Sequence, residues 1–133
     1  MTATTAKVRW SETDPPVEVA DGKHLEDCLR SLAERCRPGL PIIAQVYVHG
    51  FEVGLGLGLP ESFVHVERES GEPPYIITVG APEAEGVRAF YLHGQHHTEI
   101  PRRNLISTPE ALRVVREFLE RGSRSTSVEW EEV

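Results

Sequence analysis

One stretch of the chain, residues 53–59, alternates valine or leucine with glycine at every step, and it constrains the possible fold more than any other segment. Successive side chains of a β-strand point to opposite faces of a sheet, so the apolar side chains share one face and the glycines lie on the other. The glycines leave that face bare, which permits close approach of a helix of this chain or of another chain. A nucleotide-binding loop is excluded, because its glycines form a turn that opens a helix, and here no helix follows.

Two amphipathic helices are predicted, one before and one after the strand-rich middle of the chain. Apolar residues recur at three-and-four spacing over residues 21–36, and Pro38-Gly39 ends this helix. At the start of the second helix, Ser107–Glu110 forms a capping box, or Thr108 is the cap and Pro109 the first helical residue. Gly122 is the residue expected to end it.

Short apolar runs bounded by turn residues predict the strands, and the connections between them favour antiparallel hairpins over crossovers. Val8 and Trp10 fit an edge strand, although residues 1–20 are otherwise poorly defined. The predicted strands are 41–48, 53–59, 63–67, 75–79, 87–92, 97–100 and 125–130. The sum is one α+β domain over residues 1–133, an antiparallel meander of about six to seven strands with one N-terminal and one C-terminal helix packed on it.

The composition predicts a soluble protein that resides in the cytoplasm. Hydrophobic residues make up 39% of the 133 residues, and no apolar run approaches the roughly 20 residues that span a bilayer. The first residues lack the pattern of a secretory signal. Cys28 and Cys36 lie in the first predicted helix about 12 Å apart, too far for a disulfide, and are interpreted as small buried hydrophobic residues.

The net charge of −7 argues against a nucleic-acid-binding protein. Acidic residues concentrate between residues 41 and 100, whereas residues 101–124 are rich in arginine. The acidic segment is either a solvated surface or a surface complementary to a basic partner.

A histidine cluster, His93, His96 and His97 with Glu99 beside it, is the only constellation with enzyme-like chemistry. Histidine and carboxylate bind zinc well, so a small zinc-dependent hydrolase is the alternative function. The segment fits a strand-turn-strand hairpin, in which His96 and His97 point to opposite faces. We therefore expect surface histidines, and no catalytic residue, metal or cofactor is predicted.

From residue 75 onward, the order of features resembles a known protein family. Thr98-Glu99-Ile100-Pro101 and the ending of helix, glycine and strand with Trp130 are its most specific parts. The remaining matching segments are Val53–Pro60, Tyr75–Gly80, Phe90–His97, Asn104–Ile106 and Ala111–Leu119. Over roughly residues 41–132, the chain is similar to the first-numbered immunity-protein family of bacterial polymorphic toxin systems, which is frequent in actinobacteria.

This resemblance implies a non-enzymatic protein that binds and neutralises a secreted toxin, encoded by a neighbouring gene and used in competition between bacteria. Members of the family are typically paired with deaminase-fold toxins, which use a zinc-activated water and a glutamate to convert a nucleobase. The implied partner is this toxin domain, with no nucleic acid and no membrane.

A toxin-binding surface follows from the charge pattern as a hypothesis. A nucleic-acid deaminase should have a basic substrate groove, and the acidic segment would occupy it in place of phosphates. If the contact is instead steric, Phe51 or Tyr75 would provide it. The preferred acidic contacts are Glu67, Glu69 and Glu72 on the central hairpin, with Glu83 and Glu85 on the next loop.

Overall fold

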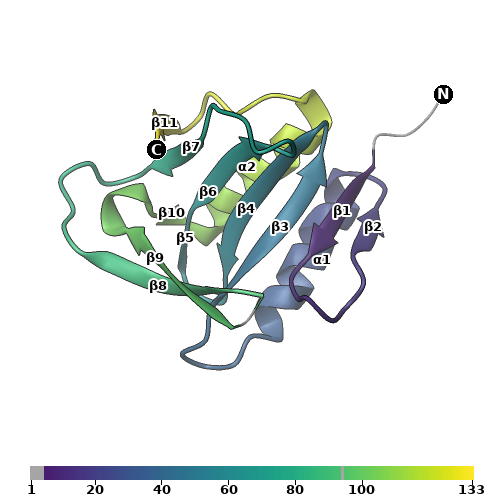
Figure 1. Cartoon of the computed structure of the whole chain (residues 1–133), viewed down its shortest axis with the longest axis horizontal. Helices are drawn as coiled ribbons and strands as arrows, with labels where there is room; N and C mark the ends of the chain where they lie inside the picture. Colours follow the sequence, from purple (N-terminus) through teal and green to yellow (C-terminus); the bar gives the residue numbers. More distant parts are fainter. Residues whose placement is uncertain (1–4, 94) are drawn as a thin grey trace.

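The computed structural model describes residues 5–93 and 95–133, which form two α-helices, a short 3-10 helix and eleven β-strands (Figure 1). The elements follow in the order β1 (Ala6–Arg9), β2 (Val17–Val19), α1 (Gly22–Glu34), β3 (Ile42–Val48), β4 (Phe51–Leu57), β5 (Glu61–Ser62), β6 (Val64–Arg68), β7 (Ile76–Val79), β8 (Val87–Leu92), β9 (His96–Pro101), η1 (Arg102–Asn104), β10 (Ile106–Ser107), α2 (Thr108–Arg121) and β11 (Glu129–Glu132).

Within the described residues, nine strands form one sheet, whose main path runs β11-β7-β6-β4-β3-β1-β2. All neighbours on this path are antiparallel. Off the path, β8 pairs in parallel with the start of β3 and antiparallel with β9. The strands β5 and β10 form a separate pair. The predicted α+β class, an antiparallel meander carrying two helices, is confirmed.

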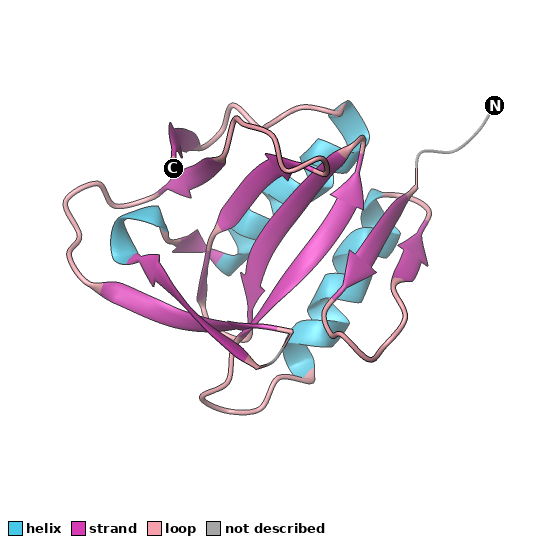
Figure 2. Cartoon of the chain, viewed as in Figure 1, coloured by secondary structure: helices cyan, strands magenta, loops and turns pink. Residues whose placement is uncertain are grey.

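Both helices pack on the same face of the sheet (Figure 2). Their apolar stripes, from Leu25 to Leu32 in α1 and from Ala111 to Leu119 in α2, meet the alternate buried residues of the strands. In β4 these residues are Val53, Leu55 and Leu57, all fully buried. The apolar half of the alternating segment thus forms the centre of the main core.

The predicted starts of both helices and the predicted end of α2 are confirmed, whereas α1 ends at Glu34, before the predicted Pro38-Gly39. The Asp21 side chain accepts a hydrogen bond from the His24 amide at 2.8 Å at the start of α1. At α2, Ser107 accepts from the Glu110 amide at 3.3 Å, and its hydroxyl donates to the Glu110 carboxylate at 2.9 Å. Gly122 ends α2 with a left-handed φ of 74°.

The glycine half of β4 faces away from the helices, so of the two alternatives for this bare face, packing of a helix of this chain is wrong. Phe90 from β8 covers Gly56 instead, and a Cβ added at Gly56 would lie 2.3 Å from the Phe90 ring. Phe90 also contacts Phe63 edge-on, with ring centroids 5.2 Å apart. The β8–β9 hairpin is therefore held against this face by a small second core.

Three predictions about single elements need correction, one about a position in the sheet and two about boundaries. The segment with Val8 is not an edge strand, because β1 lies between β3 and β2, which returns after Pro15-Pro16 and forms the edge. The last strand begins at Glu129 rather than Ser125. The Ser125 hydroxyl is hydrogen-bonded to the hydroxyl and to the backbone amide of Ser127, which holds residues 125–127 in a bend. Cys36 lies beyond the end of α1.

Both cysteines are free and half-buried rather than fully buried. Burial raises the pKa of each thiol, most strongly through loss of solvation, so both stay protonated at neutral pH. Neither has the depressed pKa of a reactive cysteine. None of the helices in the described residues is long and apolar enough to cross a membrane.

Candidate binding surface on the open sheet face

The face of the sheet opposite the helices, which we call the open face, carries a row of polar side chains. The strand register places Lys7, Tyr47, Glu52 and Glu67 side by side across β1, β3, β4 and β6. Glu52 and Glu67 are directly opposite each other on neighbouring strands, where Cβ atoms are typically about 5 Å apart. Two carboxylates thus share one small region of the sheet.

A second row runs beside the first, again fixed by register. It comprises Arg9, Gln45, Gly54, His65 and Ile77 on β1, β3, β4, β6 and β7. Because Gly54 has no side chain, a depression lies between Gln45 and His65. The next residue of β4 on this face is Gly56, which the Phe90 ring covers.

Hydrogen bonds tie the two rows together around Glu52. The Gln45 side-chain amide donates to Glu52 Oε1, and the Tyr47 hydroxyl donates to the same oxygen at 3.2 Å. The remaining amide oxygen of Gln45 is buried, and no described residue donates a hydrogen bond to it. A buried acceptor of this kind costs free energy until a donor reaches it.

The pKa shifts on the open face reflect partial burial of charged groups. Loss of solvation, followed by the nearby Glu67 carboxyl, raises the pKa of Glu52. Burial lowers the pKa of His65, and the Glu52 charge opposes this only in part, so His65 is neutral at pH 7. The pKa of Tyr47 is raised by burial and by Glu52. Negative charge is therefore held here at an energetic cost.

A cavity of about 330 Å³ opens between these rows and the β8–β9 hairpin. Its apolar walls are formed by side chains of the second core, including Ile43, Phe63, Ile77 and Ile100, while Gly54 forms part of its floor. Three carboxylates line it, from Glu52, Glu67 and Glu99. The cavity thus combines apolar walls with a strongly acidic lining.

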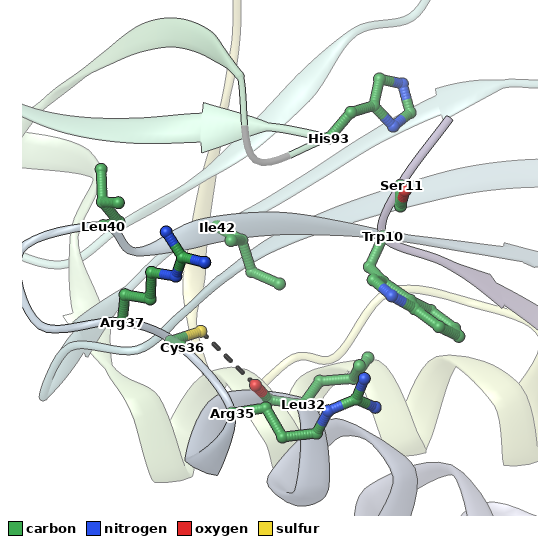
Figure 3. A pocket seen from close by; sticks show the side chains of 9 residues that line it. All are labelled: Trp10, Ser11, Leu32, Arg35, Cys36, Arg37, Leu40, Ile42 and His93. Carbon is green, nitrogen blue, oxygen red and sulfur yellow. Dashed lines mark hydrogen bonds between the residues drawn. The ribbon is translucent and has the colours of Figure 1, made fainter. Parts of the chain in front are cut away.

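A second hollow, of about 290 Å³, lies between the end of α1 and β1 (Figure 3). Trp10 lines one side, and the exposed Arg35 and Arg37 lie on the other. The Cys36 thiol donates to the Leu32 carbonyl oxygen at 3.4 Å and so takes part in the local structure. This hollow has the opposite charge to the cavity of the open face.

The two aromatic residues predicted as steric contacts have roles within the fold. Phe51 faces the helix layer, where its ring meets Phe118 edge-on at 5.4 Å between centroids. Tyr75 is half-buried, and its hydroxyl donates to the Gly71 carbonyl within the β6–β7 turn.

The five predicted glutamates are not brought together into one patch. Glu67 lies on the open face beside the cavity. Glu69 and Glu72 are exposed in the turn between β6 and β7, whereas Glu83 and Glu85 are exposed in the loop between β7 and β8, at the opposite end of β7. The two groups would therefore reach different parts of a partner.

The histidine cluster is spread over the β8–β9 hairpin. His96 contacts Glu12 at 3.4 Å, while the His97 ring lies against Tyr91, with centroids 5.7 Å apart. The rings of His93 and His96 are 6.3 Å apart. Among the described residues, no group of three or more histidine, cysteine or acidic side chains is placed to hold a metal ion.

Gln45, Glu52 and His65, which line the cavity, and Tyr47, which donates a hydrogen bond to Glu52, were not among the site residues predicted from the sequence. Their signal is the polar half of the same alternation that identified the strands. In β3 and β4, the positions that face away from the buried valines and leucines are polar residues and glycines, except for Ile43. A register between strands was needed to bring them together.

These features define a small α+β domain that covers one face of its sheet with helices and leaves on the other a cavity lined by three carboxylates. Residues 13–132 match the family model described as Immunity protein Imm1, so the chain belongs to this family of immunity proteins. The match extends further toward the N-terminus than the resemblance over residues 41–132. No curated protein matches the chain.

Proposed function

We propose that this immunity protein neutralises a secreted toxin of the nucleic-acid deaminase class, acting in the cytoplasm by binding alone. The open face, with its acidic cavity, covers the substrate groove of the toxin. Membership of the Imm1 family supports the toxin as partner, and the three carboxylates that line the cavity support a basic surface on that toxin.

The mechanism follows from what a nucleic-acid deaminase must bind. Its substrate carries one negative charge per nucleotide, so the groove leading to its active site is lined by cations. A protein with a net charge of −7 approaches such a groove quickly, and carboxylates then replace the phosphates. Bound in this way, the immunity protein excludes the substrate without any reaction of its own.

The proposed contacts start at the cavity and continue along the β6–β7 hairpin. Glu67 lies at the cavity, and Glu69 and Glu72 extend the acidic surface to the adjoining turn. Glu83 and Glu85 form a second contact at the far end of β7, where they would reach the rim of the groove.

The experiment pairs this chain with the toxin domain encoded beside its gene. Co-expression should rescue cells from the toxin, and the purified chain should stop deamination of single-stranded DNA or RNA at a stoichiometric ratio. Reversing all five glutamates to lysine should weaken binding by more than tenfold, about 1.4 kcal/mol. Reversing Glu34 and Glu120, exposed on the helix layer, is the control and should change affinity less than threefold.

Each part of the proposal can fail separately. A neighbouring toxin that cleaves nucleic acid or proteins instead of deaminating a base would contradict the deaminase class. An affinity that the five reversals leave within tenfold would reject the electrostatic contact and favour steric occlusion. Absence of rescue would reject the immunity function itself.

A further inference from the structure

Resting on the function proposed above, we propose that the cavity of the open face receives one arginine side chain of the toxin. The aliphatic part of the arginine lies against the apolar walls, and its guanidinium group reaches Glu52, Glu67 and the amide oxygen of Gln45. This contact anchors the toxin to the centre of the sheet.

Charge is the first argument. Three carboxylates line the cavity, and among the described residues none of the three takes part in an ion pair. His65, the basic group of the same lining, is kept neutral by burial. Lys7 and Arg9 lie on β1 beside Tyr47 and Gln45, but neither lines the cavity. The lining itself thus holds negative charge without a cation, which makes the cavity complementary to a cationic group.

The unsatisfied acceptor is a second, independent argument. The buried Oε1 atom of Gln45 has no donor among the described residues, although the other end of the same amide is held by Glu52. Gln45 lines the cavity, so a small rotation of its side chain would bring this oxygen to an N–H group that enters the cavity and pairs with the neighbouring carboxylates. A cation that carries several N–H donors can therefore satisfy this oxygen and the carboxylates together.

The shape and the acceptor geometry favour arginine over lysine. Glu52 and Glu67 face each other on neighbouring strands, and Gln45 lies beside Glu52 on the next strand. A planar guanidinium presents five N–H donors in a fixed fork, whereas an ammonium is a compact charge with three. The apolar walls formed by Ile43 and Ile77 suit the methylene stem of a long basic side chain.

Gly54 keeps the cavity open. A Cβ at this position would meet only Ile43 at 3.8 Å and the Ala44 carbonyl at 4.0 Å, both ordinary contacts. The missing side chain is therefore not required by packing of the strand. Gly54→Val projects into the cavity without changing any charge.

The first experiment measures the affinity of the full chain for the toxin domain encoded beside its gene. Glu52→Gln combined with Glu67→Gln should weaken binding about 100-fold, because buried charge pairs contribute most at such sites. Gly54→Val should weaken it at least tenfold while the protein remains folded. The matched control, Glu34→Gln with Glu120→Gln, removes the same charge from the helix layer, outside the proposed contacts, and should change affinity less than threefold.

A double-mutant cycle then identifies the arginine. Each surface arginine of the toxin domain is changed to alanine, and one of them should couple to the Glu52/Glu67 pair by at least tenfold. Lysine at that position should restore only part of the affinity. If no arginine couples, or if the control pair weakens binding as much as the cavity pair, the proposal is wrong.

A second experiment needs no toxin. N-acetyl-arginine methylamide at millimolar concentrations should shift the backbone amide signals of Gly54 and His65, and the isosteric but neutral citrulline derivative should not. If the chain binds no neighbouring toxin, the function proposed above fails, and this measurement alone then decides whether the cavity binds a guanidinium. Equal shifts with both compounds, or none with either, would overturn that binding.

Discussion

Glu52 and Glu67 are neighbours across β4 and β6 at a position where an ordinary sheet would place opposite charges. Burial and the second carboxyl together raise the pKa of Glu52, so the native protein binds its proton more tightly than the unfolded chain does. Above the raised pKa this site destabilises the fold, and the penalty disappears as the pH falls through the raised value toward the ordinary value of 4.5.

Glu52→Gln should therefore stabilise the protein at pH 7, by about 0.5–1 kcal/mol. The new amide can still accept from Gln45 and Tyr47, and it can donate to Glu67. At pH 4, where Glu52 is protonated in the wild type, the gain should vanish. Urea denaturation of both proteins at the two pH values checks this, and an equal effect at both would show that charge is not its cause.

At the scale of single residues, the sequence allowed only some of the site to be predicted. Glu67 was proposed from its charge and position on a hairpin, and it lines the cavity. Gln45 and His65 carry no signal of their own, because an isolated polar residue on a strand is usually only solvated. Their importance depends on which residues of other strands lie beside them.

Among the elements, helices and strands follow from local pattern, while the placement of the β8–β9 hairpin does not. The two capping-box residues at the start of α2, Ser107 and Glu110, are three residues apart and can be recognised directly in the sequence. Phe90 and Gly56, by contrast, are far apart in sequence and meet only because β8 joins β3 in parallel. The short connections in the sequence favour antiparallel hairpins, so they give no indication that β8 lies parallel to β3.

We expect Gly56 to be essential for the packing of the β8–β9 hairpin against the sheet. Gly56→Ala would bring a methyl group 2.3 Å from the Phe90 ring and should cost about 1–3 kcal/mol of folding stability. Gly54→Ala, on the same strand and face but with open space above it, is the matched control and should be neutral or slightly stabilising. Denaturation midpoints of the two variants check the difference, and equal values would contradict the packing described for Phe90.

For the whole molecule, the separation of helices and open face gives a distribution of charge that the net value of −7 conceals. Basic groups of α2 pair within the helix layer, as Arg113 does with Glu117 and Arg116 with Glu120. The carboxylates at the cavity have no such partners among the described residues.

Association with the toxin should consequently depend on salt through its rate. Raising the ionic strength from about 0.05 to 0.5 M should slow association by at least tenfold and change the dissociation rate much less, because screening acts on the approach of exposed charges. Stopped-flow or surface binding kinetics would measure both rates. An association rate that salt leaves unchanged would show that encounter with the toxin is not steered by charge.

The two-sided sheet has a consequence for how such proteins diverge. The main core uses only the side chains under the helices, so Gln45, Tyr47 and Glu52 can be exchanged with little loss of folding free energy. A lineage facing an altered toxin can therefore retune recognition by point substitution while it inherits the same scaffold unchanged. Specificity and architecture are encoded by alternate residues of the same strands.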